Sequence, residues 1–204
     1  DHESVALEFY IGPDAAASRY LFLGARGTGQ LTVSANGIPA IRGTWTGLWT
    51  LPGTQAKPTG VDLSNFVDPQ VATKANTPTF TIDAIPFVMR SFTLDFANDV
   101  QARMLVGREA IIIVDRNETI AATVEAVPLG TYNPYARASA TPKARFPIVV
   151  AHGTVAGRRV RIDVPKATQN RATGFENQQG VLEWPLNFTP MPDAGDDQWK
   201  ITLS

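Results

Sequence analysis

The sequence contains few side chains that could carry out catalysis. It has two histidines, His2 and His152, and no cysteine. A catalytic serine needs a base and an orienting carboxylate, and no Gly-x-Ser-x-Gly segment is present. A zinc site would need carboxylates in addition to both histidines. We therefore expect no enzymatic activity and no cofactor, and we interpret His152 as a hydrogen-bonded residue near the end of a strand.

Carboxylates and glycines provide two further candidate sites. Asp193, Asp196 and Asp197 could hold calcium, but they lack the alternating ligands and the bidentate glutamate of an EF-hand loop. Solvated carboxylates in a turn are the favoured interpretation. The glycine-rich segment 24–29 has the composition of a phosphate-binding loop, yet no Gly-Lys-Ser/Thr and no helix follow it. We interpret it as a turn.

The only basic cluster consists of Arg158, Arg159 and Arg161. On a strand, the last two would share a face with Asp163, which favours a solvated or interfacial surface of ion pairs. A stripe that contacts DNA is the alternative. The residues between them would face the core: Val160, Ile162 and Val164.

The overall composition is that of an ordinary globular protein. Hydrophobic residues make up 44% of the 204 residues and charged residues 18%, so one domain spanning 1–204 is expected. The net charge is -1, which argues against tight binding to DNA phosphates. No apolar run approaches the roughly 20 residues of a membrane span, so no membrane partner is expected.

Alternating apolar and polar residues recur along the chain and predict an all-β fold with one short helix. The helix is expected at 132–140, where Asn133 can cap it and Pro134 occupies the first helical position. Pro185 suggests that its strand lies at an edge. Strands are expected at 5–9, 20–23, 31–35, 43–49, 88–96, 110–114, 122–127, 146–152, 160–164, 181–188 and 199–203.

Asn36-Gly37 predicts a tight type I′ hairpin, since both residues tolerate positive φ. Its return strand would place Trp45 and Trp49 on one face, with Gly47 leaving room between the two indoles. The strand at 122–127 is expected to return from a turn at 115–118.

Two segments suggest contacts between subunits. Residues 51–79 are interrupted by prolines and exceed the length of ordinary loops, which indicates either a linker or an arm that packs on a neighbouring subunit. Residues 110–114 are apolar on both faces, so this strand must be central or covered by another chain or sheet. The residues expected at a ring or stacking interface are Ile111, Ile112, Ile113, Pro58, Phe66 and Val67.

Five segments in order carry a resemblance to a known family. They are LGARGT at 23–28, VEAVPL at 124–129, HGTVAG at 152–157, IDVPKA at 162–167 and DAGDD at 193–197. Together they resemble the tail tube proteins of long-tailed, siphophage-like bacteriophages and prophages. The resemblance covers most of the chain and is thinnest in the 51–79 loop.

This resemblance implies a β-sandwich or barrel-like subunit that assembles into hexameric rings. The rings stack into a hollow virion tail tube that conducts DNA into the host, with assembly in the bacterial cytoplasm. Other tail proteins, such as the tape measure and the tail terminator, are implied as partners. Members of the family often carry a further N-terminal segment.

Two other functions remain open. A monomeric β-sandwich that binds carbohydrate or another ligand would use exposed aromatic side chains as a platform. The candidates for this platform are Trp45, Trp49 and Trp199. A hydrolase would need paired carboxylates, and Asp95, Asp115 and Glu125 are available but occur at no telling spacing.

Overall fold

A computed structural model describes residues 3–64 and 66–204, and the fold there is all-β, with fifteen strands and one short helix. The chain forms two compact units. Unit 1 comprises residues 1–29, 42–67 and 96–117, and unit 2 comprises 30–41, 68–95 and 118–204. No single cut in the sequence separates them. A single folding domain over 1–204 stays a prediction.

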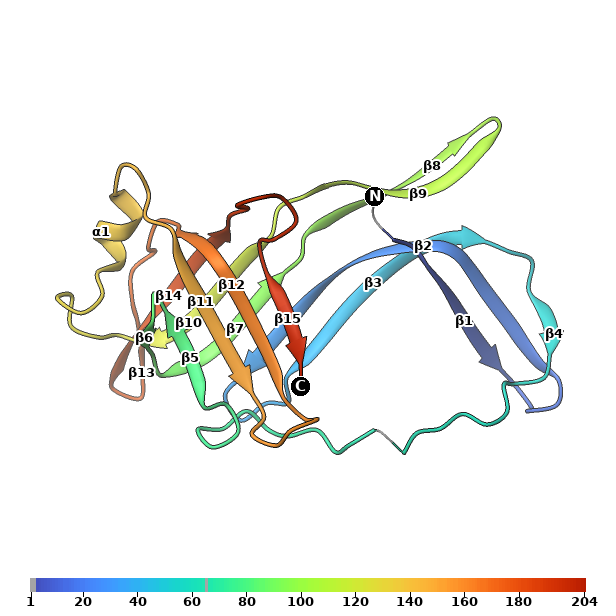
Figure 1. Cartoon of the computed structure of the whole chain (residues 1–204), viewed down its shortest axis with the longest axis horizontal. Helices are drawn as coiled ribbons and strands as arrows, with labels where there is room; N and C mark the ends of the chain where they lie inside the picture. Colours follow the sequence, from blue (N-terminus) through green and yellow to red (C-terminus); the bar gives the residue numbers. More distant parts are fainter. Residues whose placement is uncertain (1–2, 65) are drawn as a thin grey trace. The chain divides into compact units, whose positions relative to one another are not determined.

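Unit 2 is a sheet in which the hydrogen-bonded neighbours are antiparallel. Its path begins with residues 30–34 of β2 (Ala17–Ser34) and continues through β7 (Met89–Asp95), β10 (Thr119–Glu125), β14 (Val181–Pro190), β12 (Val160–Gln169), β11 (Phe146–His152), β5 (Thr79–Ile82) and β6 (Ile85–Pro86). Two further strands pair at the side of this path, β13 (Glu176–Gln178) with β14 and β15 (Lys200–Leu203) with β12. Figure 1 shows these strands in two layers.

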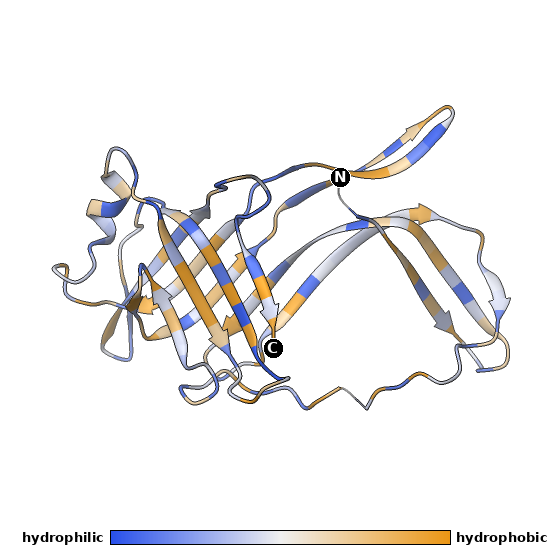
Figure 2. Cartoon of the chain, in the orientation of Figure 1, coloured by the Kyte–Doolittle hydropathy of each residue, from blue (hydrophilic) through white to orange (hydrophobic). Residues whose placement is uncertain are grey.

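The sheet of unit 2 folds back on itself around an aromatic core. Phe80 of β5 and Phe92 of β7 are far apart along the strand order, yet their ring centroids lie 6.1 Å apart. Phe146 of β11 and Phe188 of β14 make a second edge-to-face contact at 6.0 Å. Apolar side chains alternate along these strands, and β11 is mostly hydrophobic (Figure 2). Unit 2 is therefore a sandwich with its own core.

The predicted helix is confirmed as α1 (Pro134–Ser139). The side chain of Asn133 accepts hydrogen bonds from the backbone N–H groups of Tyr135 and Ala136, and Pro134 occupies the first turn. These contacts satisfy N–H groups that a helix leaves without an internal partner.

The predicted hairpin joins β2 to β3 (Ala40–Trp49), but its turn differs from the expected type I′. Only Asn36 has a positive φ, of 59°, while Gly37 donates its backbone N–H to the carbonyl of Ser34. Asn36 and Gly37 also exchange backbone hydrogen bonds with Ala72. The connection therefore spans residues 35–39 and is held by a segment far away in the sequence. Local turn preferences, on which the type I′ prediction was based, do not take such distant contacts into account.

Two expectations about pairing are wrong. The strand at 122–127 does not return along 110–114, because β10 pairs with β7 and β14. Pro185 does not mark an edge strand either, since β14 has neighbours on both sides. Pro185 lies between residues 181–183, which pair with β13, and residues 188–190, which pair with β12. That interruption of the ladder leaves room for a residue without an N–H.

Unit 1 contains β1 (Val5–Ile11), residues 17–29 of β2, residues 42–49 of β3, β4 (Gly53–Gln55), and the ribbon of β8 (Asn98–Leu105) and β9 (Arg108–Arg116). The glycine-rich segment 24–29 is not the expected turn, because β2 runs through it as a single strand. Only Gly24 in this segment has a positive φ, of 57°, close to a register shift between β1 and β2. The 51–79 segment holds little regular structure apart from β4.

An ion pair between the exposed Arg90 and the buried Glu183 joins β7 to β14. Arg90 donates two hydrogen bonds to the Glu183 carboxylate, at 2.6 Å and 2.5 Å, and Glu183 is buried. Glu125 lies opposite Glu183 on β10. The hydrogen bonds from Arg90 lower the pKa of Glu183 below its usual range, despite the opposing effect of burial. The charged form of Glu183 is therefore favoured in the folded state.

The Leu186→Ala substitution is expected to lower the free energy of unfolding by about 2–5 kcal/mol, because it leaves a cavity in the core of unit 2. Leu186 is 1% exposed, whereas Leu182 on the same strand is 46% exposed. Leu182→Ala is therefore the matched control, with a much smaller expected loss. Urea unfolding of both variants measures the difference, and equal losses would contradict this core.

The ion pair also predicts a pH dependence of stability. A lowered pKa in the folded state means that Glu183 stabilises the fold above its unfolded pKa of about 4.3. This contribution is lost as the pH falls through the lower folded value. Glu183→Gln should therefore reduce stability at pH 7 and flatten the loss of stability between neutral and acidic pH. Parallel slopes of unfolding free energy against pH for both proteins would contradict this role.

Candidate assembly interface

The structure places His152 as the sequence predicts, at the end of β11. Its Nδ1 lies 3.0 Å from the Thr77 hydroxyl, and burial lowers the pKa of the imidazole. The interpretation as a hydrogen-bonded residue near a strand end is confirmed. His2 lies outside the described residues.

The three C-terminal aspartates belong to a turn. Asp197 accepts the backbone N–H groups of Asp193 and Ala194 at 2.9 Å and 3.0 Å, and these bonds lower its pKa. Asp193 also forms an ion pair with Lys166. The carboxylates are therefore engaged by the turn and by a neighbouring lysine, as the interpretation of turn carboxylates predicts.

Two carboxylates considered for a hydrolase are far apart. Asp95 lies opposite Thr119 at the start of β10, whereas Glu125 ends the same strand. Glu125 lies six residues beyond Thr119 on β10, which corresponds to about 20 Å along the strand. Carboxyl groups that act together on a glycosidic bond lie about 5–10 Å apart. Asp115 accepts the backbone N–H of Arg116 within β9.

The basic cluster contains the predicted ion pair, although only Arg161 of its three arginines lies on β12, and Arg158 and Arg159 precede the strand. Arg161 contacts the Asp163 carboxylate, with its NH2 nitrogen 2.7 Å from the nearer oxygen. Ile162 and Val164 are buried on the other face. The alternation of the predicted strand is therefore confirmed.

The two units differ sharply in how they bury apolar side chains. Among the described residues, 24 hydrophobic residues are buried, and only Ala17, Ala25 and Ile111 of these belong to unit 1. Two of the three are alanines, which bury little area. Unit 1 therefore has almost no hydrophobic core of its own.

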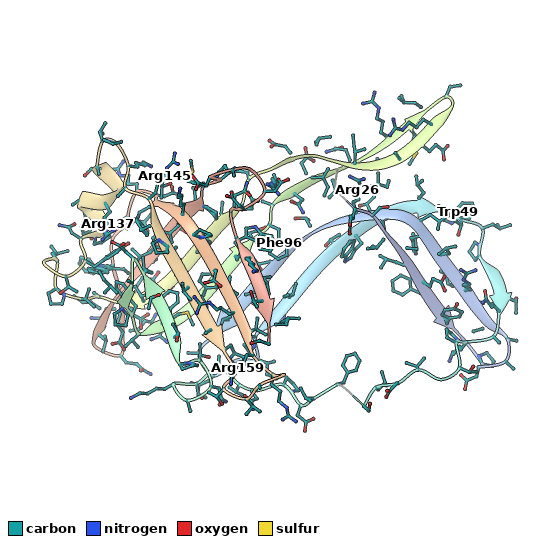
Figure 3. The ribbon with its side chains drawn as sticks, viewed as in Figure 1. Arg26, Trp49, Phe96, Arg137, Arg145 and Arg159 are labelled. Atoms are coloured by element: carbon teal, nitrogen blue, oxygen red, sulfur yellow. The ribbon has the colours of Figure 1, made fainter. Side chains whose placement is uncertain are left out.

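Unit 1 instead exposes many large apolar side chains. Phe9 is 53% exposed, Trp49 is 69% exposed, and Leu51 is 81% exposed. Figure 3 shows Trp49 near the end of β3. The other large hydrophobic residues exposed in unit 1 are Val5, Ile11, Tyr20, Leu23, Trp45, Val61, Leu63, Phe66, Val67, Met104, Leu105, Val106 and Val114. A surface with this much exposed apolar area marks an interaction site or an aggregation hazard.

The ribbon of β8 and β9 ends in an apolar tip that the sequence analysis missed. Met104, Leu105 and Val106 are 54%, 50% and 109% exposed, and Gly107 follows with a φ of 88°. Hydrogen bonds from Asn98 to Thr28 and Gly27 connect the base of the ribbon to β2. A three-residue apolar run before a glycine was the signal that could have identified this tip.

The predicted interface residues differ in accessibility. Ile111 is buried within the ribbon, and Ile112 and Ile113 are half-buried. In the described chain β9 pairs with β8 alone, so its other edge has no strand beside it. The remaining members, Pro58, Phe66 and Val67, are exposed in the 51–79 segment. Coverage of these groups by another chain stays a prediction.

The two tryptophans of β3 are exposed, but one lies directly over a glycine. A Cβ atom added to Gly27 would lie 2.8 Å from Trp45 Cδ2 and 2.8 Å from the Thr44 carbonyl oxygen. Gly47 faces Phe22 and Ala25 in a similar way, with the added Cβ 2.8 Å from the Phe22 Cβ. Gly27 and Gly47 therefore permit close packing between β2 and β3. The sequence had suggested for Gly47 only that it leaves room between the two indoles.

Gly27→Ala is expected to displace the Trp45 indole and to lower the free energy of unfolding by about 1–3 kcal/mol, since the new methyl group overpacks the contact. Gly53→Ala is the matched control, because no atom lies within 4 Å of the position its Cβ would take. Near-ultraviolet circular dichroism reports the indole environment. An unchanged tryptophan signal in Gly27→Ala would contradict the packing of Trp45 over Gly27.

Neither comparison with known proteins assigns the chain to a family. No protein-family model matches the sequence, and no curated protein sequence matches it. Within residues 3–64 and 66–204, none of the helical structure is long and apolar enough to cross a membrane.

Proposed function

We propose that this chain is a structural subunit that assembles with copies of itself into a hollow tube, as the tail tube proteins of long-tailed bacteriophages do. The observation that supports this most is the contrast between the units. Unit 2 has its own core, whereas unit 1, where the structure describes it, buries only three hydrophobic residues and exposes many large ones. A surface of that kind is expected to become buried when copies associate.

The strand edges of unit 1 support the same proposal. Among the described residues, β1 pairs with β2 alone, and β8 and β9 pair only with each other. Unpaired strand edges are templates for pairing with another chain. An isolated two-stranded ribbon is also at most marginally stable in water, so β8 and β9 would gain stability from a neighbour.

The exposed apolar side chains of unit 1 belong to different elements, among them β1, β3 and the tip of the β8–β9 ribbon. Contact between two different patches of this kind would favour a ring. A contact between two different patches of one chain is heterologous, and repetition of it closes a ring if the rotation allows. The resemblance to tail tube proteins implies six subunits in each ring and stacking of the rings. In this proposal the tape measure and the tail terminator are the other partners, and the tube belongs to the virion tail.

The near-neutral charge suits a passage for DNA. With 18 basic and 19 acidic residues, the subunit offers little net attraction to phosphates. Each lysine or arginine that neutralises a DNA phosphate increases the affinity for DNA. A channel lined by many basic residues would therefore retain the genome. A channel of near-neutral subunits would let DNA pass without holding it.

One observation favours a second candidate function. Trp45 and Trp49 are 52% and 69% exposed, and alternation places them on the same face of β3. Exposed aromatic rings form platforms for sugars and other ligands. A binding module of this type would remain monomeric and bind its ligand saturably, whereas a tube subunit would bury these rings between copies.

Negative-stain electron microscopy and light scattering of concentrated protein test the proposal. Rings or tubes with an open channel are expected for the unaltered chain. Phe9→Lys should prevent or strongly reduce them, because it places a charge on the apolar surface of unit 1. Phe175→Lys is the matched control, since Phe175 is 64% exposed but lies in unit 2.

Equal assembly of Phe9→Lys and the unaltered chain would contradict the role of unit 1. A strictly monomeric chain at all salt and protein concentrations, combined with saturable binding of an oligosaccharide that Trp49→Ala abolishes, would favour the binding module instead.

A further inference from the structure

Unit 2 has an apolar groove at the end of its sandwich. The floor consists of buried residues from β2, β11 and β12, and the groove encloses about 190 Å³. Ile41 of β3 and Leu203 of β15 line it as exposed residues, at 60% and 75%. His152 is its main polar lining residue. The buried residues of the floor are Leu31, Val33, Val150 and Ile162.

The size of the groove indicates the class of its occupant. Small-molecule sites usually enclose about 300–1,000 Å³, so this groove is small for a cofactor or metabolite. Its apolar lining also offers few groups that would orient a polar ligand. A single large apolar side chain in a pocket is, by contrast, a common anchor of protein interfaces. The groove therefore fits a side chain of a protein segment.

The chain itself carries two exposed apolar segments that could enter such a groove, and charge distinguishes them. The groove lies beside basic residues, since Arg159 exchanges backbone hydrogen bonds with Ser204, next to Leu203. Arg158 and Arg159 are exposed there, and Figure 3 shows Arg159 near the lower end of β12. The tip of the β8–β9 ribbon is flanked by Arg103 and Arg108, which these residues would repel.

The other segment has the complementary charge. Residues 58–73 contain Asp62 and Asp68, which are the charged residues nearest to Phe66 in the sequence, and lie between Lys57 and Lys74. Phe66 is 81% exposed in this segment, and its neighbours Leu63 and Val67 are also exposed. We name residues 58–73 the acidic arm. Opposite charges within about one Debye length, roughly 8 Å at physiological salt, would favour its approach to the groove.

Local hydrogen bonds already shape the arm for this contact. Asp62 accepts the backbone N–H of Ser64 at 2.8 Å, and Phe66 donates its backbone N–H to the Leu63 carbonyl at 3.0 Å. The bonds from Ser64 lower the pKa of Asp62, which keeps this carboxylate charged. A turn that presents Phe66 before binding reduces the entropy lost on binding.

We infer that the groove of unit 2 is the receptor for the acidic arm of a second copy of this chain, with Phe66 as the anchor. This inference rests on the proposed function and deepens it, because it names the two surfaces of one heterologous contact. The arm of each copy enters the groove of the next, so the contact repeats around a ring or along a tube.

A peptide with the sequence of residues 58–73, carrying a fluorescent label, tests this contact directly against the full chain. Fluorescence anisotropy should show saturable binding to the unaltered protein. Leu203→Glu should weaken binding at least tenfold, because it places a charge at the exposed rim and opposes the acidic arm. Leu129→Glu is the matched control, since Leu129 of unit 2 is 53% exposed and does not line the groove.

Replacing Phe66 by alanine in the peptide should also weaken binding at least tenfold. No binding by the unaltered protein, or equal binding by Leu203→Glu, would overturn the inference. A peptide of residues 98–116 that binds the groove while the arm peptide does not would assign the groove to the β8–β9 ribbon, and would overturn it as well.

Mixing two full-length variants separates this inference from the proposed function. Phe66→Ala has an altered arm and an intact groove, whereas Leu203→Glu has an intact arm and an altered groove. In a mixture, the arm of Leu203→Glu can enter the groove of Phe66→Ala, which gives one contact per pair. Light scattering should show one-to-one complexes in the mixture and not in either variant alone. If the unaltered chain forms rings but neither variant changes them, the tube proposal stands and the receptor assignment fails.

Discussion

The burial of apolar side chains in unit 1 is the constraint on which the remaining features depend. A sheet buries a face only when another layer covers it. In unit 2, the contact between Phe80 and Phe92 joins two layers, and a closed core follows. In the described part of unit 1, the aromatic contact between Phe9 and Phe22 joins only the neighbouring strands β1 and β2, and the only buried residue larger than alanine is Ile111. In the proposed tube, much of the free energy that holds unit 1 together would come from neighbouring copies.

This difference separates two roles within one chain. Unit 2 can fold on its own hydrophobic core and provide a stable base. In the proposed tube, unit 1 would become buried as copies meet, which makes its stability depend on protein concentration. The exposed edges of β1, β8 and β9 carry the corresponding risk of incorrect pairing.

Local signals in the sequence predicted individual elements well. Asn133 and Pro134 located the helix, and the alternation of residues 146–152 gave β11 with its observed bounds. Pairing between strands was much harder to predict, because it depends on segments far apart in the chain. Pro185 is the clearest example, since its position in an interior strand is tolerated only where β13 ends and β12 begins.

The candidate interface was predictable only in part for the same reason. Phe66 and Val67 stand out in a proline-rich segment, so the sequence alone pointed to the arm. The groove could not be found that way, because Val33, Val150, Ile162 and Leu203 read as ordinary strand residues until four strands bring them together. The overall composition also gave no indication that the buried hydrophobic residues lie almost entirely in unit 2.

A heterologous contact also explains why one chain would carry surfaces of such different character. In a two-fold dimer, the arm of each copy would enter the groove of the other, so both contacts would be used at two copies. In a ring, the arm of each copy enters the groove of the next copy around the axis, so the contact continues beyond two copies. In an open series of copies, one end copy retains an unused arm and the other end copy an unused groove until the ring closes. Closure therefore adds one contact without adding a subunit, which favours complete rings over open chains of the same length.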